Sequence, residues 1–118
     1  AALAGEPLVV YGDGTQSRDF TYVGTVAGVL TDAVVRRVAG PEPVNLAFGT
    51  RSTLLDLIEQ LGHLFGRELP VRFESVRAGD VAHSQAQHTR LDALFPGVRP
   101  VALAEGLRAT VDWMNDAR

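Results

Sequence analysis

The sequence contains no cysteine. A disulfide framework and a thiolate zinc site are therefore excluded, and the composition is compatible with a reducing intracellular compartment. Long apolar runs are also missing, so no segment is predicted to cross a bilayer, and the N-terminus lacks the basic and apolar regions of a signal peptide. We accordingly expect a soluble, cytoplasmic chain.

Positive charge is scarce as well. Eleven Lys and Arg residues stand against fourteen Asp and Glu, which gives a formal net charge of −3. The basic residues are spread along the chain and form no basic stretch of the kind that neutralises phosphate backbones. Neither nucleic acid nor a membrane is therefore expected as a partner. Apolar residues are plentiful, at 46% of 118, which suffices for one moderate core and predicts a single domain over residues 1–118.

The apolar periodicity predicts alternating strands and helices. Short β-rich runs predict strands at 8–11, 20–23, 44–48 and 70–76. Helical spacing of apolar residues predicts helices at 26–38, 54–65, 89–95 and 104–114. Thr25 is expected to cap the first of these helices, and Ser52 or Thr53 the second. This alternation predicts a small mixed α/β fold.

The two ends of the chain carry further expectations. Residues 1–4 followed by Gly5 are typical of the last turn of a helix, so the chain is expected to begin inside an element. In the closing helix, Met114 is expected to face inward and Trp113 to act as a packing anchor.

Residues 11–23 read Tyr-Gly-Asp-Gly-Thr-Gln-Ser-Arg-Asp-Phe-Thr-Tyr-Val, a strand, a glycine turn and a second strand. Gly12 and Gly14 bracket Asp13, a spacing that suits a tight turn with a positive φ. On the residues alone, the segment could be a plain hairpin. Arg18, just past the turn, could instead donate two parallel hydrogen bonds to phosphate oxygens, although most arginines in loops are only solvated.

The order of the motifs resembles the C-terminal, substrate-binding region of the NAD-dependent epimerase/dehydratase family, the extended short-chain dehydrogenases, with enzymes like UDP-glucose 4-epimerase as the nearest analogy. After GDG-x-Q-x-RDF come N-x-x-x-G before a helix, R-x-GD, L-x-x-x-FP and finally EGL-x-x-TV-x-W. The resemblance runs from Leu8 to Trp113. It implies a region that binds a nucleotide diphosphate-sugar, with UDP as the expected nucleotide.

The resemblance implies a phosphate clamp. It assigns phosphate contacts to Arg18 in the first motif and Arg77 in the second, and it places Asp80 against the nucleoside. Two arginines converging from separate loops suit the charge of a diphosphate. From the residues alone, a surface pair of Arg77 with Asp80 or Glu74 explains that arginine equally well, and such a pair would contribute little.

The resemblance also assigns the base to the strand before the glycine turn. Val9, Val10 and Tyr11 are the implied base contacts. A core strand explains the two valines at least as well, because an apolar strand needs no ligand. Tyr11 offers more, since an aromatic face at the end of a strand can stack on a base.

The family's catalytic parts are absent from this sequence. It has neither the glycine-rich dinucleotide loop nor the Tyr-x-x-x-Lys pair. We therefore expect no catalytic residue, no cofactor-binding residue and no metal ligand here. NAD is expected in the intact enzyme, held by a separate Rossmann domain and not by this chain alone. The chain is expected to be a fragment of such an enzyme, and an apolar face exposed where that domain docks could drive homo-oligomerisation.

The three histidines suggest little chemistry. His63 is expected at the solvent edge of a helix, while His83 and His88 lie near Asp80 and Ser84 in the sequence. A Ser-His-Asp triad or a metal site is not favoured, because a triad needs an oxyanion hole and a held geometry that local spacing does not provide. No HExxH pattern is present either.

Two positions depart from the family pattern. Gly24 and Thr25 stand where the family usually has aspartate, and Gln87 replaces another aspartate. Both changes are expected to weaken the start of a helix and to leave the ligand contacts alone.

The sequence leaves three hypotheses about function open. The first is substrate binding for an NAD-dependent nucleotide-sugar epimerase or dehydratase, without catalysis by this chain alone. The second is a noncatalytic nucleotide-binding or protein-interaction module derived from that family. The third is a relative that takes a non-nucleotide alcohol or ketone, for which both arginines would not be expected.

Overall fold

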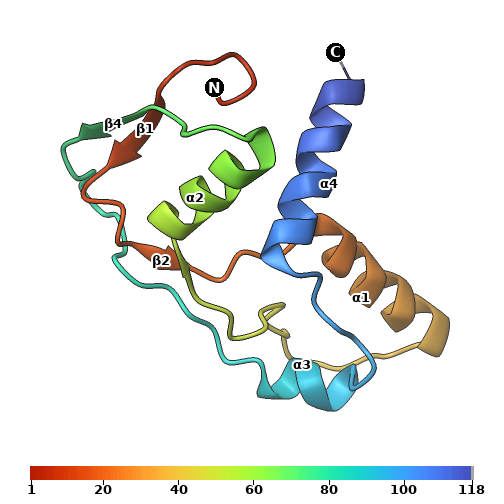
Figure 1. Cartoon of the computed structure of the whole chain (residues 1–118). Helices are drawn as coiled ribbons and strands as arrows, with labels where there is room; N and C mark the ends of the chain where they lie inside the picture. The colour runs from red at the N-terminus through yellow and green to blue at the C-terminus, as the bar shows by residue number, and fades with distance from the viewer. Residues whose placement is uncertain (118) are drawn as a thin grey trace. The chain divides into compact units, whose positions relative to one another are not determined.

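The computed structural model describes residues 1–117, and the chain forms two compact units (Figure 1). The first unit contains Ala1–Arg18 and Arg51–Ser84, and the second contains Asp19–Thr50 and the residues from Gln85 on. Both helices and strands are present, so the predicted mixed α/β class is confirmed. That residues 1–118 form a single domain stays a prediction.

The first unit holds four short strands, in two separate pairs. They are β1 (Leu8–Tyr11), β2 (Ser17–Arg18), β3 (Ser52–Thr53) and β4 (Val71–Glu74). β1 runs parallel to β4, and β2 runs antiparallel to β3. The strands predicted at 8–11 and 70–76 are therefore confirmed. The hairpin is wrong, because the glycine turn leads into β2, which pairs with β3 and not with β1.

Helix α2 (Leu54–Phe65) follows β3 directly and lies beside the pair β1–β4 (Figure 1). Its start is a capping box: the Thr53 hydroxyl accepts from the Asp56 amide at 3.0 Å, and the Asp56 carboxylate accepts from the Thr53 amide at 2.8 Å. The bond from the Thr53 amide lowers the pKa of Asp56. Gly66, with φ 62°, ends the helix. The predicted helix and its cap are confirmed.

The second unit is helical. It holds α1 (Val23–Arg36), α3 (Thr89–Leu94) and α4 (Leu103–Asp116). Its core consists of Val29 from α1 with Leu91 and Phe95 from the α3 segment, all less than 10% exposed. The three predicted helices are confirmed within a few residues at each end.

The strand predicted at 20–23 is wrong, because Tyr22 packs against two helices. Tyr22 is the residue before α1, which begins at Val23. A Cβ atom added at Gly24 would lie 2.6 Å from the Tyr22 ring, and one added at Gly106 in α4 would lie 2.9 Å from the Tyr22 side chain. The bulky pattern of this segment therefore fits a helix contact, for which the two glycines leave room.

Thr25 is not the cap that the sequence predicts. It lies inside α1, is buried, and its hydroxyl accepts a hydrogen bond from the Val101 amide at 3.1 Å. Neither α1, which starts after Tyr22, nor α3, which starts after His88, has a side-chain cap among the described residues. The cap positions are thus Tyr22 and His88, and that Gly24 and Gln87 weaken the helix starts stays a prediction.

The strand predicted at 44–48 is also wrong. The amides of Phe48 and Gly49 donate to the Asp19 carboxylate at 2.9 and 3.0 Å, and the Thr50 hydroxyl donates to the same group. A carboxylate thus replaces the neighbouring strand as hydrogen-bond acceptor. Ala47 still turns into the interior, which explains why the segment is apolar without being a strand.

The two ends of the chain differ from the prediction as well. Residues before Gly5 form a turn and not a helix: the Gly5 amide donates to the Ala2 carbonyl at 3.2 Å, and Gly5 has φ 75°. On α4, Trp113 is 68% exposed and Met114 45% exposed. The predicted packing roles of these two side chains are therefore wrong.

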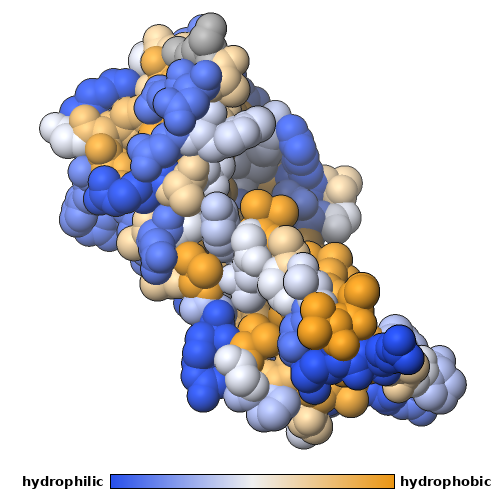
Figure 2. Space-filling view, turned by 90° about the vertical axis from the view of Figure 1, so that its right-hand side faces the viewer, coloured by the Kyte–Doolittle hydropathy of each residue, from blue (hydrophilic) through white to orange (hydrophobic). Residues whose placement is uncertain are grey.

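Apolar surface is plentiful in the second unit. Four side chains of α1 are well exposed: Val23, Leu30, Val34 and Val35. Figure 2, which views the side of Figure 1 where α1 lies, shows orange apolar surface gathered in its lower half. None of the helices in the described range 1–117 combines the length and the hydropathy that a membrane crossing needs.

Candidate functional site

A cleft of about 470 Å³ lies in the first unit. The end of β1, the glycine turn, the end of β4 and the segment 80–83 form its walls. The lining residues are Tyr11, Gly12, Asp13, Thr15, Gln16, Glu74, Ser75, Val76, Asp80, Val81, Ala82 and His83. The cleft thus contains parts of both sequence motifs that the resemblance assigns to a nucleotide.

The glycine turn on one wall is held in shape by its own side chains. Gly12 and Gly14 have φ values of 81° and 80°, which confirms the predicted positive φ. The Asp13 carboxylate accepts from the hydroxyl and the amide of Thr15 at 2.7 and 3.0 Å. Both bonds lower the pKa of Asp13, and the bond from the Thr15 hydroxyl has the larger effect. A Cβ atom at Gly14 would lie 2.7 Å from Leu55, so the turn closely approaches α2.

The same turn is fastened to the start of α2. The amides of Leu54 and Leu55 donate to the carbonyls of Gln16 and Gly14 at 3.1 and 3.2 Å. Together with the capping box, these bonds satisfy the first free amides of the helix. The start of α2 therefore positions the turn and offers no open anion site of its own.

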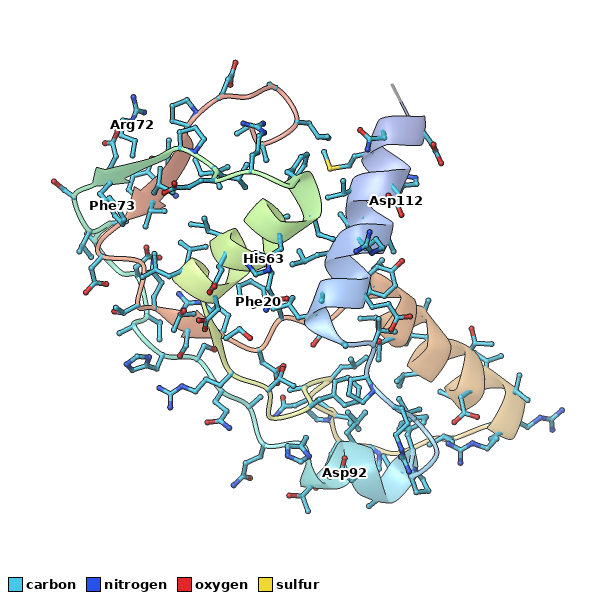
Figure 3. All side chains as sticks on the ribbon, in the orientation of Figure 1. Phe20, His63, Arg72, Phe73, Asp92 and Asp112 are labelled. Carbon is cyan, nitrogen blue, oxygen red and sulfur yellow. The ribbon has the colours of Figure 1, made fainter. Side chains whose placement is uncertain are left out.

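Arg77 joins the two motifs. Its guanidinium lies 3.6 Å from the centre of the Tyr11 ring, a cation–π contact. Glu74 forms an ion pair with Arg72 at 3.2 Å, and Asp80 meets Arg77 through a bond from its amide to the Arg77 carbonyl. The surface pairs considered for Arg77 are therefore not the contacts that its guanidinium makes. In Figure 3, Arg72 and Phe73 lie on opposite sides of β4, as the alternation of a strand requires.

Arg18 is placed differently from Arg77. Its guanidinium donates to the Ser17 carbonyl at 2.8 Å and reaches the Ala82 carbonyl at 3.5 Å. Ala82 lines the cleft, so Arg18 contacts the backbone of the cleft wall. Of the predicted site residues, Tyr11 and Asp80 line the cleft. Arg77 and Arg18 are not among its lining residues, but each contacts one, Tyr11 and Ala82 respectively.

The two valines of β1 differ in exposure. Val10 is 1% exposed and belongs to the core, while Val9 is 41% exposed. The amides of Leu8 and Gly12 donate to carbonyls on the β4 side. Because backbone groups alternate along a strand, the amides and carbonyls of Val9 and Tyr11 point to the other edge of β1. Gln16 already donates to the Tyr11 carbonyl there, at 2.9 Å.

A polar cluster at the cleft was not predicted. Ser17 is 2% exposed, and its hydroxyl oxygen lies 3.0 Å from Nδ1 of His83 and 3.0 Å from Nε of Arg51. The sequence suggested Ser84 and Asp80 as neighbours of His83. The sequence gives no signal for Ser17 as the partner of His83, because the two residues lie far apart along the chain.

The other histidines lie outside this cleft. His63 lies on α2 with its side chain 77% exposed (Figure 3), as predicted. His88 pairs with Asp92 of α3 at 2.7 Å. Within residues 1–117, no three His, Cys, Asp or Glu side chains gather in a way that could hold a metal ion.

The glycine turn does not fit a dinucleotide cofactor. A dinucleotide fold needs a strand, a glycine turn and then a helix whose free amides face the pyrophosphate. Here the turn leads into β2, and the nearby start of α2 already has its amides bonded. This turn is therefore not the glycine-rich loop of a dinucleotide fold.

A second hollow of about 610 Å³ lies between α2 and β4. Its apolar lining residues are Leu55, Ile58, Leu69 and Val71, and charged residues such as Glu59 and Arg67 also line it. The first cleft contains parts of both motifs that the resemblance assigns to a nucleotide, and we therefore take it as the candidate site.

No family model matches the chain. It is 29% identical over 113 residues to a UDP-glucuronate 4-epimerase of Thermodesulfobacterium geofontis, with 94% of this chain and 34% of the relative aligned. It is also 29% identical over 119 residues to a UDP-glucose 4-epimerase of Mycolicibacterium smegmatis, with 98% and 37% aligned.

Among solved structures, the chain is similar to the UDP-glucuronic acid 4-epimerase of Bacillus cereus in complex with UDP-glucuronic acid and NAD. The TM-score is 0.87 at 26% identity, over 98% of this chain and 37% of that one. The chain spans only about a third of the length of these relatives. It matches the C-terminal portion of extended short-chain dehydrogenases, which confirms the resemblance seen in the sequence.

Proposed function

Because this chain matches the C-terminal portion of the extended short-chain dehydrogenase epimerases in sequence and fold, we propose that it binds the UDP part of a nucleotide-sugar. In this proposal the chain holds the nucleotide and orients the sugar for an NAD-dependent epimerase or dehydratase. It does not catalyse the reaction alone.

One observation carries the proposal: Tyr11 lines the cleft, and the Arg77 guanidinium lies 3.6 Å from the centre of its ring. Each comes from one of the two motifs that the resemblance assigns to the nucleotide. The contact brings a permanent positive charge to a cleft of a size that suits a small ligand.

The cleft offers matching groups for each part of UDP. The Arg77 guanidinium suits the diphosphate, since it can donate two parallel hydrogen bonds to phosphate oxygens. The Asp80 carboxylate can accept from ribose hydroxyls. The backbone edge of β1 at Val9 and Tyr11 can bond a base. Arg18 supports the wall through Ala82 and lies close enough to add a second positive charge.

The chain's contribution to the reaction is positional. Holding a substrate in a reactive orientation can supply several kcal/mol of rate enhancement. The hydride acceptor and the base that removes a proton belong to parts that this sequence does not contain. NAD, when bound elsewhere in an intact enzyme, would supply the redox chemistry.

Calorimetric titration of the chain with UDP tests the proposal. We expect binding that weakens about tenfold or more in Arg77→Ala, and also in Arg18→Ala, because each removes a charged donor. Arg108→Ala is the matched control, since Arg108 lies exposed on α4 in the other unit. Uridine should bind more weakly than UDP and respond little to Arg77→Ala.

A failure to bind UDP would favour the second candidate function, a protein-interaction module. If UDP at millimolar concentration does not bind, or if the Arg108 control weakens binding as much as Arg77→Ala, the nucleotide site is refuted. The exposed apolar side chains of α1 would then favour a protein-interaction module.

A further inference from the structure

We propose that His83 is a further ligand-binding residue of the cleft, donating from Nε2 to an oxygen of bound UDP. The buried Ser17 hydroxyl and Arg51 select the ring tautomer that allows this. This inference rests on the proposed function and adds a residue to it.

The backbone holds His83 at the cleft wall. A bridge joins Ser17 to His83: the Ser17 amide donates to the Ala82 carbonyl at 3.0 Å, and the Ser84 amide donates to the Ser17 carbonyl at 3.2 Å. The two bonds bracket His83 from both sides. The imidazole is further tied through Nδ1 to the Ser17 hydroxyl. Two bonds thus fix the backbone on either side of His83 and one fixes its ring, which preorganises the side chain.

The direction of each bond around the Ser17 hydroxyl follows from the chemistry of its partners. Arg51 Nε lies 3.0 Å away, and a guanidinium only donates, so the hydroxyl oxygen accepts this bond. The hydroxyl proton then needs an acceptor, because Ser17 is 2% exposed and an unpaired buried donor is costly. Nδ1 of His83 at 3.0 Å is the acceptor in reach.

This arrangement leaves Nε2 as the donor. In a neutral imidazole whose Nδ1 accepts, the proton resides on Nε2. His83 lines the cleft with Tyr11 and Asp80, and no hydrogen bond from Nε2 is found within residues 1–117. The donor is therefore available to a ligand. Its partner is an oxygen acceptor, which UDP carries both on its diphosphate and on its uridine.

Two substitutions separate a ligand donor from a structural brace. In His83→Gln, the side-chain amide reaches the position of Nε2 and can still donate to the ligand. In His83→Asn, the amide reaches only the position of Nδ1 and can still bond Ser17. A purely structural role predicts that Asn is the better replacement, and ligand donation predicts that Gln is.

The experiment is calorimetric titration of the 118-residue chain with UDP and with uridine. We expect His83→Asn to weaken UDP binding about tenfold, and His83→Gln to stay within about threefold of the wild type. His63→Asn, on the exposed side of α2, is the control and should bind normally. If His83→Asn weakens uridine as much as UDP, the acceptor lies on the nucleoside. If it weakens UDP alone, the acceptor lies on the diphosphate.

Nitrogen NMR of the imidazole checks the tautomer independently of binding. The wild type should show the proton on Nε2, and Ser17→Ala should shift the ring toward a mixture of tautomers. A proton found on Nδ1 in the wild type would overturn the inference. The inference would also be overturned if the wild type, His83→Asn and His83→Gln bound UDP with equal affinity. Equal losses of UDP affinity in the two variants would overturn it too.

The outcomes also separate this inference from the proposed function. If UDP binds and the binding depends on Arg77 but not on His83, only the role of His83 fails. If the wild type does not bind UDP at all, the proposed function fails and the role of His83 fails with it.

Discussion

Tyr11, which the resemblance assigns to the base, makes a contact in the structure that the sequence did not predict. The guanidinium of Arg77 covers one face of its ring at 3.6 Å. The ring face carries partial negative charge, which attracts a cation and holds the long Arg77 side chain in place. In the proposed site, we therefore expect Tyr11 to act by positioning Arg77.

We predict that Tyr11→Phe leaves UDP affinity within about twofold, because the ring face is kept. Tyr11→Leu should weaken UDP binding about two- to fivefold, the range expected for an exposed cation–π contact. Calorimetric titration measures both. In the Arg77→Ala background, Tyr11→Leu should have little further effect. Full additivity of the two changes would show that Tyr11 does not act through Arg77.

At the scale of elements, the start of α2 decides the position of the glycine turn. The capping box of Thr53 and Asp56 defines where the helix begins, and the next two amides hold the turn by its carbonyls. The Thr53 amide stabilises the ionised form of Asp56, which is why the pKa of this carboxyl lies below its ordinary value of 3.8.

This shift predicts a pH dependence of stability. Because the pKa of Asp56 is lowered on folding, its contribution is present above about pH 4, the ordinary value, and is lost as the pH falls through the folded pKa. Urea unfolding of the wild type and Asp56→Asn should therefore differ at neutral pH, with the wild type more stable. The difference should vanish in acid.

The control for this experiment is Asp112→Asn, on an exposed part of α4 (Figure 3). It should leave the acid dependence of unfolding unchanged. A difference between wild type and Asp56→Asn that stays constant from neutral pH to about pH 2 would contradict the role given to the Asp56 carboxylate.

At the scale of the whole molecule, the chain spans only about a third of the length of the relatives that it matches. The role that we propose is positioning, because the sequence has neither the glycine-rich dinucleotide loop nor the Tyr-x-x-x-Lys pair. Under this proposal, catalysis depends on groups outside these 118 residues.

We predict that the chain incubated with UDP-glucose and NAD forms no UDP-galactose above a blank without protein. The reason is that positioning alone provides no hydride acceptor. Chromatographic separation of the two UDP-sugars measures the outcome, and a full-length UDP-glucose 4-epimerase serves as the positive control. Sustained formation of UDP-galactose by the chain would refute the noncatalytic assignment.

The sequence by itself determined the helices, the strand β1, the cap of α2 and the family resemblance. Each depends on local information: apolar periodicity, capping side chains such as Thr53, or motif order. The positive φ of Gly12 and Gly14 was predictable for the same reason, because a residue's own conformational limits decide it.

Only the tertiary structure decided which residues meet. The strands expected at 20–23 and 44–48 are absent because Tyr22 packs on helices and because the Asp19 carboxylate replaces a neighbouring strand. Such partners lie far along the chain, so local patterns cannot reveal them. Local patterns also cannot reveal the contact of Arg77 with Tyr11 or the bond of His83 to Ser17. Folding alone brings the buried Ser17 to His83.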